Sequence, residues 1–185
     1  MAFWRDMQGQ DPKRQYRWVM RMASIPAYVV KKVTKPSFTV SESEHKYLNH
    51  TYYYPGRVTW NSVTMTIADP IDPDVASTIA NIVRNSGYKP ALDETEVSTI
   101  SKQGAVNSLG NQIEIVQLDA DGNAVQTWKL ITPWIKDAKF GDLDYEGDDM
   151  TDVEIELRYD WAELITASDP APAIPGTRHV WGLSD

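Results

Sequence analysis

The segment Asp152–Trp161 constrains the fold most strongly, because it alternates between apolar and polar residues without exception. Its apolar positions are Val153, Ile155, Leu157, Tyr159 and Trp161, and its polar positions are Glu154, Glu156, Arg158 and Asp160. Successive side chains on a strand point to opposite faces, so this pattern predicts a strand with one buried face and one solvated face. Such strands are typical of antiparallel sheets that cover a core on one side only.

The rest of the chain predicts more strands and one helix. We expect strands over residues 16–22, 29–40, 58–68 and 134–143, and a hairpin over 111–130 whose turn contains Asp121-Gly122. A helix is expected over residues 73–86, with Asp72 as its N-cap and Pro73 at its first position. With six or seven strands, the predicted fold class is mainly β: an antiparallel β-sandwich or open barrel with one packed α-helix.

The chain divides into an arm, one domain and a tail. A chain of 185 residues is long enough for one self-sufficient core, which we assign to residues 16–165. Residues 1–15 mix glycine, proline and charges and are interpreted as an N-terminal arm, and residues 166–185 form a Pro-rich C-terminal tail. Within the domain, residues 41–57 are expected to be a long polar loop and residues 89–109 a loop or insertion.

The loop over residues 41–57 is unusual for its aromatic residues. Tyr52, Tyr53 and Tyr54 are consecutive, so they cannot all face one core, and at least one of them projects outward. Tyrosine and arginine are enriched in subunit interfaces, and Arg57 follows closely. We therefore predict a subunit interface here, with the candidate residues Tyr52, Tyr53, Tyr54, Arg57, Glu42, Glu44 and Lys46.

Composition excludes several kinds of chemistry. The chain has no cysteine, which rules out disulfides, iron–sulfur clusters, thiol nucleophiles and cysteine-bound zinc. Its net charge of −8 argues against a protein that grips nucleic acid by its phosphates. No apolar run approaches the roughly 18 residues of a membrane span, so no membrane partner is expected. Residues 1–92 hold 12 basic and 7 acidic residues, whereas residues 93–185 hold 6 and 19, which suggests unlike patches that meet within or between copies.

Metal and catalytic signals are weak. The acidic run Asp142, Asp144, Glu146, Gly147, Asp148, Asp149, Asp152 begins like a calcium loop, but position 12 falls on Val153 and the flanks are strands rather than helices. An acidic turn is the favoured interpretation. His45, His50 and His179 have no third ligand at zinc-site spacing. No nucleophile elbow, phosphate loop or dinucleotide fingerprint is present, and we predict neither catalysis nor a cofactor.

The sequence also resembles a known family. The stretch Tyr54-Pro55-Gly56-Arg57-Val58-Thr59-Trp60-Asn61-Ser62-Val63-Thr64-Met65, the acidic-Pro helix start, the hairpin and the closing strand Val153–Trp161 resemble the tail-tube proteins of contractile-tailed bacteriophages. The resemblance covers roughly residues 16–163, whereas residues 89–109 and the tail depart from the pattern.

This resemblance implies a structural subunit of a virion tail, assembled in the host cytoplasm. Copies would form hexameric β-barrel rings that stack into a hollow tube, with the 41–57 loop reaching the adjacent ring. Sheath, baseplate and tail-terminator proteins would be its partners, and DNA would pass through the lumen during ejection without specific binding. Candidate lumen-lining residues are Glu154, Glu156, Asp160, Ser62, Thr64 and Thr66. The alternative is that this face is an ordinary solvated one.

Two other functions stay open at this point. Seven Trp and nine Tyr would also suit a monomeric carbohydrate-binding β-sandwich, with or without calcium. The many carboxylates would allow an acid-pair hydrolase, although no pair stands out from the others.

Overall fold

The computed structural model describes residues 12–23, 25–90 and 98–166. Most of the predicted arm over 1–15, residues 91–97 of the predicted insertion and the tail after Thr166 lie outside the described residues, and so does His179.

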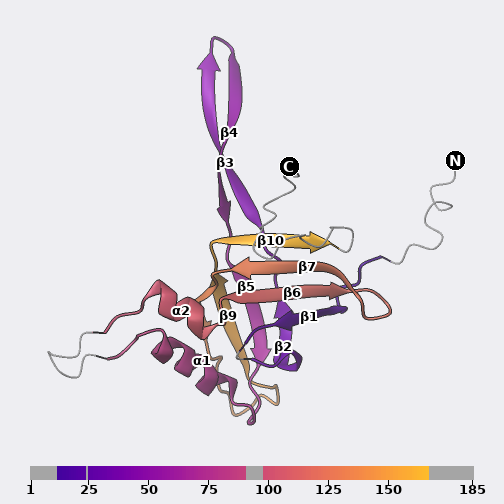
Figure 1. Cartoon of the computed structure of the whole chain (residues 1–185), viewed down its shortest axis with the longest axis vertical. Coiled ribbons are helices and arrows are strands. Elements are labelled where there is room, and N and C mark those ends of the chain that lie inside the picture. Colours follow the sequence, from indigo (N-terminus) through magenta and orange to yellow (C-terminus); the bar gives the residue numbers. More distant parts are fainter. Residues whose placement is uncertain (1–11, 24, 91–97, 167–185) are drawn as a thin grey trace, which may run out of the picture.

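The first of two four-stranded sheets has the order β1-β6-β7-β10, with every neighbouring pair antiparallel. Its strands are β1 (Trp18–Arg21), β6 (Gln112–Leu118), β7 (Ala124–Ile131) and β10 (Trp161–Thr166). They run across the view in Figure 1. β6 and β7 form the predicted hairpin, and Asp119 fixes its turn by accepting hydrogen bonds from the backbone of Asp121 (2.9 Å) and Asn123 (2.8 Å).

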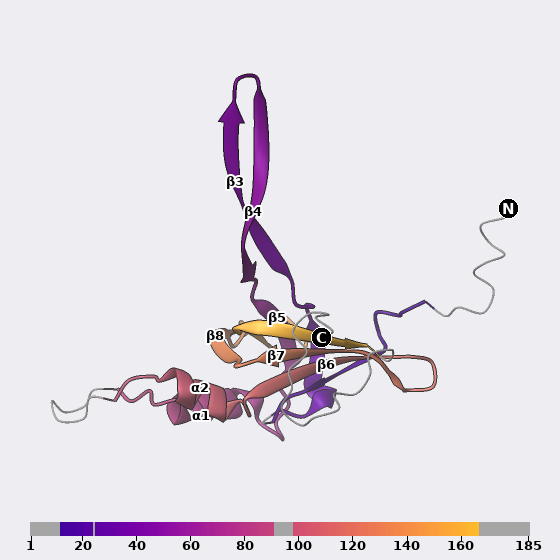
Figure 2. The same ribbon diagram turned by 45° about the horizontal axis from the view of Figure 1, so that its top comes forward.

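The second sheet has the order β2-β5-β9-β8 and is also antiparallel throughout. Its strands are β2 (Val30–Val33), β5 (Val63–Ala68), β9 (Asp152–Arg158) and β8 (Trp134–Lys139), and a 3-10 helix, η1 (Ala27–Val29), leads into β2. β3 (Phe38–Tyr47) and β4 (His50–Trp60) form a separate two-stranded hairpin that projects far from both sheets (Figures 1 and 2).

The hydrophobic core lies between the two sheets. The first sheet contributes Met20, Ile113, Ile115, Leu130 and Ala162, and the second contributes Val63, Met65, Ile67, Val153, Ile155 and Leu157. All of these residues are at most 3% exposed. The strict alternation of β5 and β9 arises because each strand presents one face to this core and the other outward.

Two α-helices lie side by side at one end of the sheets, α1 (Val75–Asn85) and α2 (Lys102–Ser108) (Figures 1 and 2). The α1 helix buries Val75, Ile79 and Ile82 against the core. Its N-cap is Asp74, whose side chain accepts a hydrogen bond from the Ser77 backbone at 2.8 Å. Gly87, at φ 106°, ends the helical conformation.

The structure corrects several predictions of local structure. Residues 41–57 are not a loop but belong to the β3–β4 hairpin. The helix begins at Val75, capped by Asp74 rather than Asp72, and the predicted insertion over 89–109 contains α2. The predicted strand over 152–161 ends at Arg158, and Trp161 begins β10 in the other sheet. The described residues therefore hold ten strands and two α-helices, not six or seven strands and one helix.

None of the helices formed by the described residues combines the length and the apolar character that crossing a membrane requires.

Candidate assembly surfaces

The β3–β4 hairpin has almost no core of its own. Every residue of β3 is exposed, and in β4 only Thr51 and Trp60 are partly buried. Within the described residues, the two strands pair only with each other. An isolated two-stranded hairpin is marginally stable in water. This hairpin therefore leaves most of its surface uncovered in the single chain.

Strand register divides the hairpin into two unlike faces. Directly opposed residues in an antiparallel pair point to the same side. The aromatic face is made by the pairs Tyr47↔His50, His45↔Tyr52 and Ser43↔Tyr54. The charged face is made by the pairs Lys46↔Thr51, Glu44↔Tyr53 and Glu42↔Pro55.

Contacts within each face are local. On the aromatic face, the His50 and Tyr52 rings meet edge to face with centroids 4.6 Å apart. On the charged face, Lys46 Nζ lies 3.7 Å from Glu44 Oε2. Tyr52, Tyr53 and Tyr54 are all exposed, so all three tyrosines project, two on the aromatic face and one on the charged face.

A bulge next to Arg57 separates the outer hairpin from its base. The register shifts between Val40 and Glu42, and the Arg57 backbone N–H donates to Ser41 Oγ at 2.8 Å. A Cβ on Gly56 would lie 2.3 Å from that same oxygen, so only glycine fits without a local shift. Bulges increase local twist and bend a strand, which sets the direction of the outer hairpin.

The base of the hairpin is tied to the core through Trp60. Its ring meets Phe38 edge to face at 5.4 Å and lies 6.0 Å from the ring of the buried Tyr159. A groove of about 600 Å³ runs beside this base, between β4, α2 and the end of β9. The hairpin thus contacts the core at its base and is exposed along the rest of its length.

Both sheets have open margins. Among the described residues, β1 and β10 each pair with one strand only, as do β2 and β8. Open strand edges present unpaired N–H and C=O groups that can accept a further strand. The described part of the chain therefore does not close either sheet on itself.

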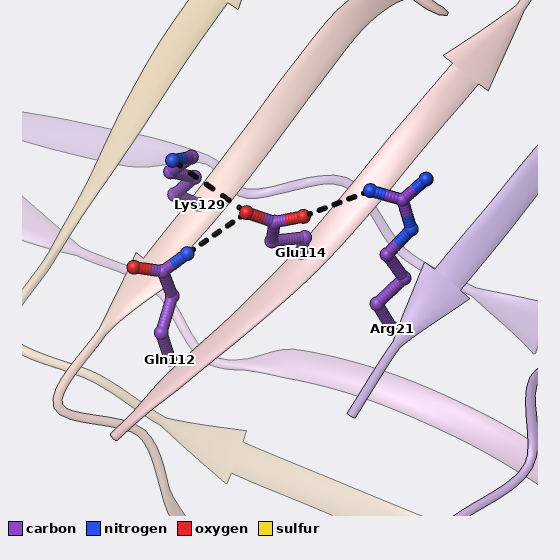
Figure 3. Close-up of polar contacts among 4 residues, drawn as sticks. All are labelled: Arg21, Gln112, Glu114 and Lys129. Atoms are coloured by element: carbon purple, nitrogen blue, oxygen red, sulfur yellow. Dashed lines mark hydrogen bonds and ion pairs between the residues drawn. The ribbon is translucent and has the colours of Figure 1, made fainter. Parts of the chain in front are cut away.

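The outward face of the first sheet carries a row of charges. Glu114 on β6 lies 3.4 Å from Arg21 Nη1 and 3.5 Å from Lys129 Nζ, and it accepts a hydrogen bond from Gln112 Nε2 at 2.8 Å (Figure 3). These residues come from β1, β6 and β7. Arg21, Glu114 and Lys129 come from three different strands and meet only through strand register, so sequence reasoning did not find this row.

Four of the predicted lumen residues share the outward face of the second sheet, where Thr64 opposes Glu156 and Thr66 opposes Glu154. Lys136 Nζ lies 2.7 Å from Glu156, and Lys139 Nζ lies 3.4 Å from Glu154. Hydrogen bonds from Lys136 and from the hydroxyl of Ser62, the fifth of these residues, lower the pKa of Glu156. The face therefore carries balanced charges rather than the unpaired acids that the sequence suggested.

The sixth predicted lumen residue, Asp160, lies elsewhere. It is in the turn between β9 and β10, where it accepts hydrogen bonds from Lys102 Nζ and Thr132 Oγ1, each at 2.6 Å. Burial acts to raise the pKa of Asp160, but these two hydrogen bonds outweigh it and the pKa is lowered. The prediction that Asp160 shares a face with Glu154 and Glu156 was wrong, because the chain changes sheets after Arg158.

The candidate metal residues do not converge. Asp142, Asp144, Glu146, Asp148 and Asp149 lie exposed in the segment between β8 and β9, and Asp152 pairs with Lys31 at 2.6 Å. His45 and His50 lie on the hairpin. No group of three or more His, Asp or Glu within the described ranges is arranged to hold a metal ion.

Comparison with known proteins identifies the fold. No family model and no curated protein matches the sequence. Among solved structures, a chain of the six-fold symmetrised anti-feeding prophage (AFP) baseplate matches with a TM-score of 0.61 at 15% identity, covering 86% of this chain and 99% of that chain. A chain of the PVC sheath-tube complex, an extracellular contractile injection system in its extended state, matches with a TM-score of 0.59 at 14% identity, covering 90% and 99%. A chain of the PVC sheath/tube terminator matches with a TM-score of 0.61 at 15% identity, covering 85% and 99%.

These neighbours confirm the predicted fold class, which is mainly β, antiparallel and of the tail-tube type found in contractile systems. At such low identity they define the fold alone. What the chain does must be argued from its own surfaces.

Proposed function

We propose that this chain is a structural, non-enzymatic subunit of the tube of a contractile tail or injection machine. Its copies join into hexameric rings, and the rings stack into a hollow tube. The observation that carries this proposal is the β3–β4 hairpin, ten and eleven residues long and exposed along its length. We interpret this hairpin as an element that connects subunits and binds to a surface of another copy.

In this proposal the hairpin spans the boundary between stacked rings. The aromatic face, with Tyr52 and Tyr54, packs against the adjacent ring. The charged face, with Glu42, Glu44, Lys46 and Tyr53, lies at the margin of the contact, and Arg57 lies at the bulge where the hairpin leaves its own subunit. Aromatic residues at the centre with charged residues at the rim are the usual anatomy of protein interfaces.

The lumen is the part of the proposal that concerns DNA. A channel that conducts DNA without holding it needs a wall with little net positive charge, because cationic walls bind phosphates. The outward face of the second sheet, with Thr64, Thr66, Glu154, Glu156 and Ser62, suits such a wall, since its acids and lysines balance. Sheath, baseplate and terminator proteins are the expected partners, and the virion tail is the expected location.

Electron microscopy of the purified full-length chain tests the proposal. We expect rings or tubes in negative stain, at protein concentrations high enough to populate the assembly. A protein that stays monomeric at all concentrations and salt strengths, also when mixed with its baseplate partners, would contradict it. Saturable binding of glycans by that monomer would instead favour the carbohydrate-binding alternative.

A further inference from the structure

One end of the core-facing side of the first sheet carries two glutamines instead of apolar residues. Gln117 on β6 directly opposes Gln126 on β7, next to the turn that joins these strands (Figure 1). Both face the core side, because Ile115 and Trp128, two residues away on the same strands, pack in or against the core. Gln117 is only 8% exposed, so its polar side chain needs partners within the chain.

Each glutamine accepts a hydrogen bond from a lysine. Lys35, in the segment between β2 and β3, donates from Nζ to Gln117 Oε1 at 2.6 Å. Lys13, which precedes β1, donates from Nζ to Gln126 Oε1 at 2.9 Å. Gln117 Nε2 in turn donates to the backbone carbonyl of Arg14 at 3.4 Å, so the oxygen of this amide is the atom that faces Lys35.

This arrangement brings the two ammonium groups together. Directly opposed residues of an antiparallel pair are neighbours, so Gln117 and Gln126 hold their lysines side by side. Burial lowers the pKa of Lys35, and the positive charge of Lys13 lowers it further. Lys13 and Lys35, which we call the lysine pair, therefore place two like charges together where one of them is partly buried, and an anion between them would relieve this repulsion.

Among the described residues, no carboxylate forms an ion pair with either member of the lysine pair, whose printed partners are amide oxygens. Other lysines in the described part of the chain lie within ion-pair distance of a carboxylate, namely Lys31, Lys46, Lys102, Lys129, Lys136 and Lys139. Asp119, the acid that follows β6, accepts hydrogen bonds from the backbone of Asp121 and Asn123 in its own turn. The lysine pair therefore keeps its full charge.

We propose that the lysine pair binds a phosphate group, either free inorganic phosphate or a phosphate monoester. Each ammonium has three N–H donors and uses one on its glutamine, so two on each lysine are left for an anion. Hydrogen bonds between charged partners are stronger than neutral ones. A phosphate monoester carries about −1.5 to −2 charges at pH 7, which matches two ammonium groups better than the single charge of a carboxylate does.

The glutamines contribute the geometry of this site. A neutral amide oxygen holds an ammonium group in place without cancelling its charge, which a carboxylate in the same position would do. Gln117 is itself held from its other side by the Arg14 carbonyl, so Lys35 is positioned before a ligand arrives. The site lies within one chain, so the proposal does not depend on the proposed assembly into rings and tubes.

Calorimetric titration of the full-length chain with inorganic phosphate, at pH 7 and constant ionic strength, tests the proposal. We expect saturable binding of one phosphate per chain. Lys35→Gln and Lys13→Gln should each weaken this binding by about tenfold or more, because each removes one of the two charges. The matched control Lys32→Gln removes the same charge from an exposed position on β2 and should change the affinity by less than about twofold.

Glycerol phosphate and acetate distinguish the possible ligands. Binding of glycerol phosphate that is tighter than that of inorganic phosphate identifies a monoester as the ligand, and binding that is no tighter identifies the free ion. Acetate should bind at least about tenfold more weakly than phosphate, because it carries a single charge, and equal binding of acetate overturns the phosphate assignment. The absence of saturable binding up to about 20 mM phosphate, or equal weakening by Lys32→Gln, overturns the site itself.

Thermal melting provides a second measurement and checks folding. Lys13 is exposed, so Lys13→Gln keeps the test valid even if Lys35→Gln loses stability with its bond to the buried Gln117. Phosphate should raise the Tm of the unmodified chain and of Lys32→Gln above the value in chloride of equal ionic strength, because a ligand of the folded state stabilises it. In Lys13→Gln this rise should fall to less than about half. An equal rise in all three chains would indicate a general salt effect and refute the site.

Discussion

Replacing both tyrosines of the aromatic face tests whether the hairpin joins stacked rings. Tyr52 and Tyr54 lie on the same face of the hairpin and are 47% and 55% exposed. A tyrosine has roughly 200 Å² of surface, so roughly 100 Å² of each ring remains for a neighbouring subunit to cover. The double variant Tyr52→Ser, Tyr54→Ser removes most of that surface.

The expected loss follows from this area. At about 25 cal/mol per Å², the two rings together contribute up to about 5 kcal/mol to each hairpin contact. Ordering of side chains offsets part of this gain, so we expect the affinity of each hairpin contact to fall by about a thousandfold. Exposed positions have little effect on the fold, so the stability of the single chain should change by less than about 0.5 kcal/mol.

Two assays separate assembly from folding. Negative-stain microscopy and sedimentation velocity measure tube length and particle size, and thermal melting followed by circular dichroism measures the stability of the chain. The control is Tyr145→Ser, because Tyr145 is fully exposed in the segment between β8 and β9. The double variant should give rings or short stacks, whereas the control should form tubes like the unmodified chain. Full-length tubes from the double variant would refute the stacking role of the aromatic face.

Three further predictions concern the stability of the single chain. Glu114→Gln should lower stability by about 0.5–1 kcal/mol, or about 1–4 °C in Tm, because Arg21 and Lys129 lose their partly buried anionic partner; an unchanged Tm would show that the row contributes nothing to folding. Asp160 has a lowered pKa in the folded state, so its tie to Lys102 stabilises the fold above the unfolded pKa of about 3.9 and is lost as the pH falls through the lower folded value. Asp160→Asn should therefore flatten the dependence of Tm on pH in this acidic range, and an identical slope would contradict this. Ile155→Ala, fully buried between the sheets, should cost about 2–5 kcal/mol in denaturant unfolding, and a cost below 1 kcal/mol would refute its place in the core.

The sequence predicted best those strands that have one face buried in the core. β5 and β9 lie at the centre of the second sheet with one face on the core, so their apolar residues alternate with polar ones. The β6–β7 hairpin was predictable because Asp121-Gly122 marks its turn. In each case the chemistry that fixes the element lies within a few neighbouring residues.

Elements without a long local pattern of apolar residues were missed. β3 and β4 show no alternation of apolar and polar residues because neither face is buried within the chain. The α2 helix has only seven residues and contains Gly104, so it lacks an apolar stripe long enough to recognise. Sequence reasoning merged β9 with Trp161 because the alternation continues through the turn where the chain passes from one sheet to the other.

The candidate surfaces likewise include features that local sequence predicts and features that depend on strand register. The exposed tyrosines were predictable, since three in a row cannot share one face. Their separation into an aromatic and a charged face depends on the register of β3 against β4, which no local pattern specifies. The charge row depends on two such registers at once, so it becomes visible only when the pairings are known.

The open margins of the two sheets differ in how their charges are paired within the chain. In the second sheet, Lys31 of β2 pairs with Asp152, and Lys136 and Lys139 of β8 pair with Glu156 and Glu154, so the charges at these margins are largely balanced within the chain. The first sheet ends in unlike charges, a cation on β1 and an anion on β10, with the apolar Leu164 and Ile165 left exposed on β10. A monomeric protein gains nothing from leaving such a margin unprotected, because it invites uncontrolled association.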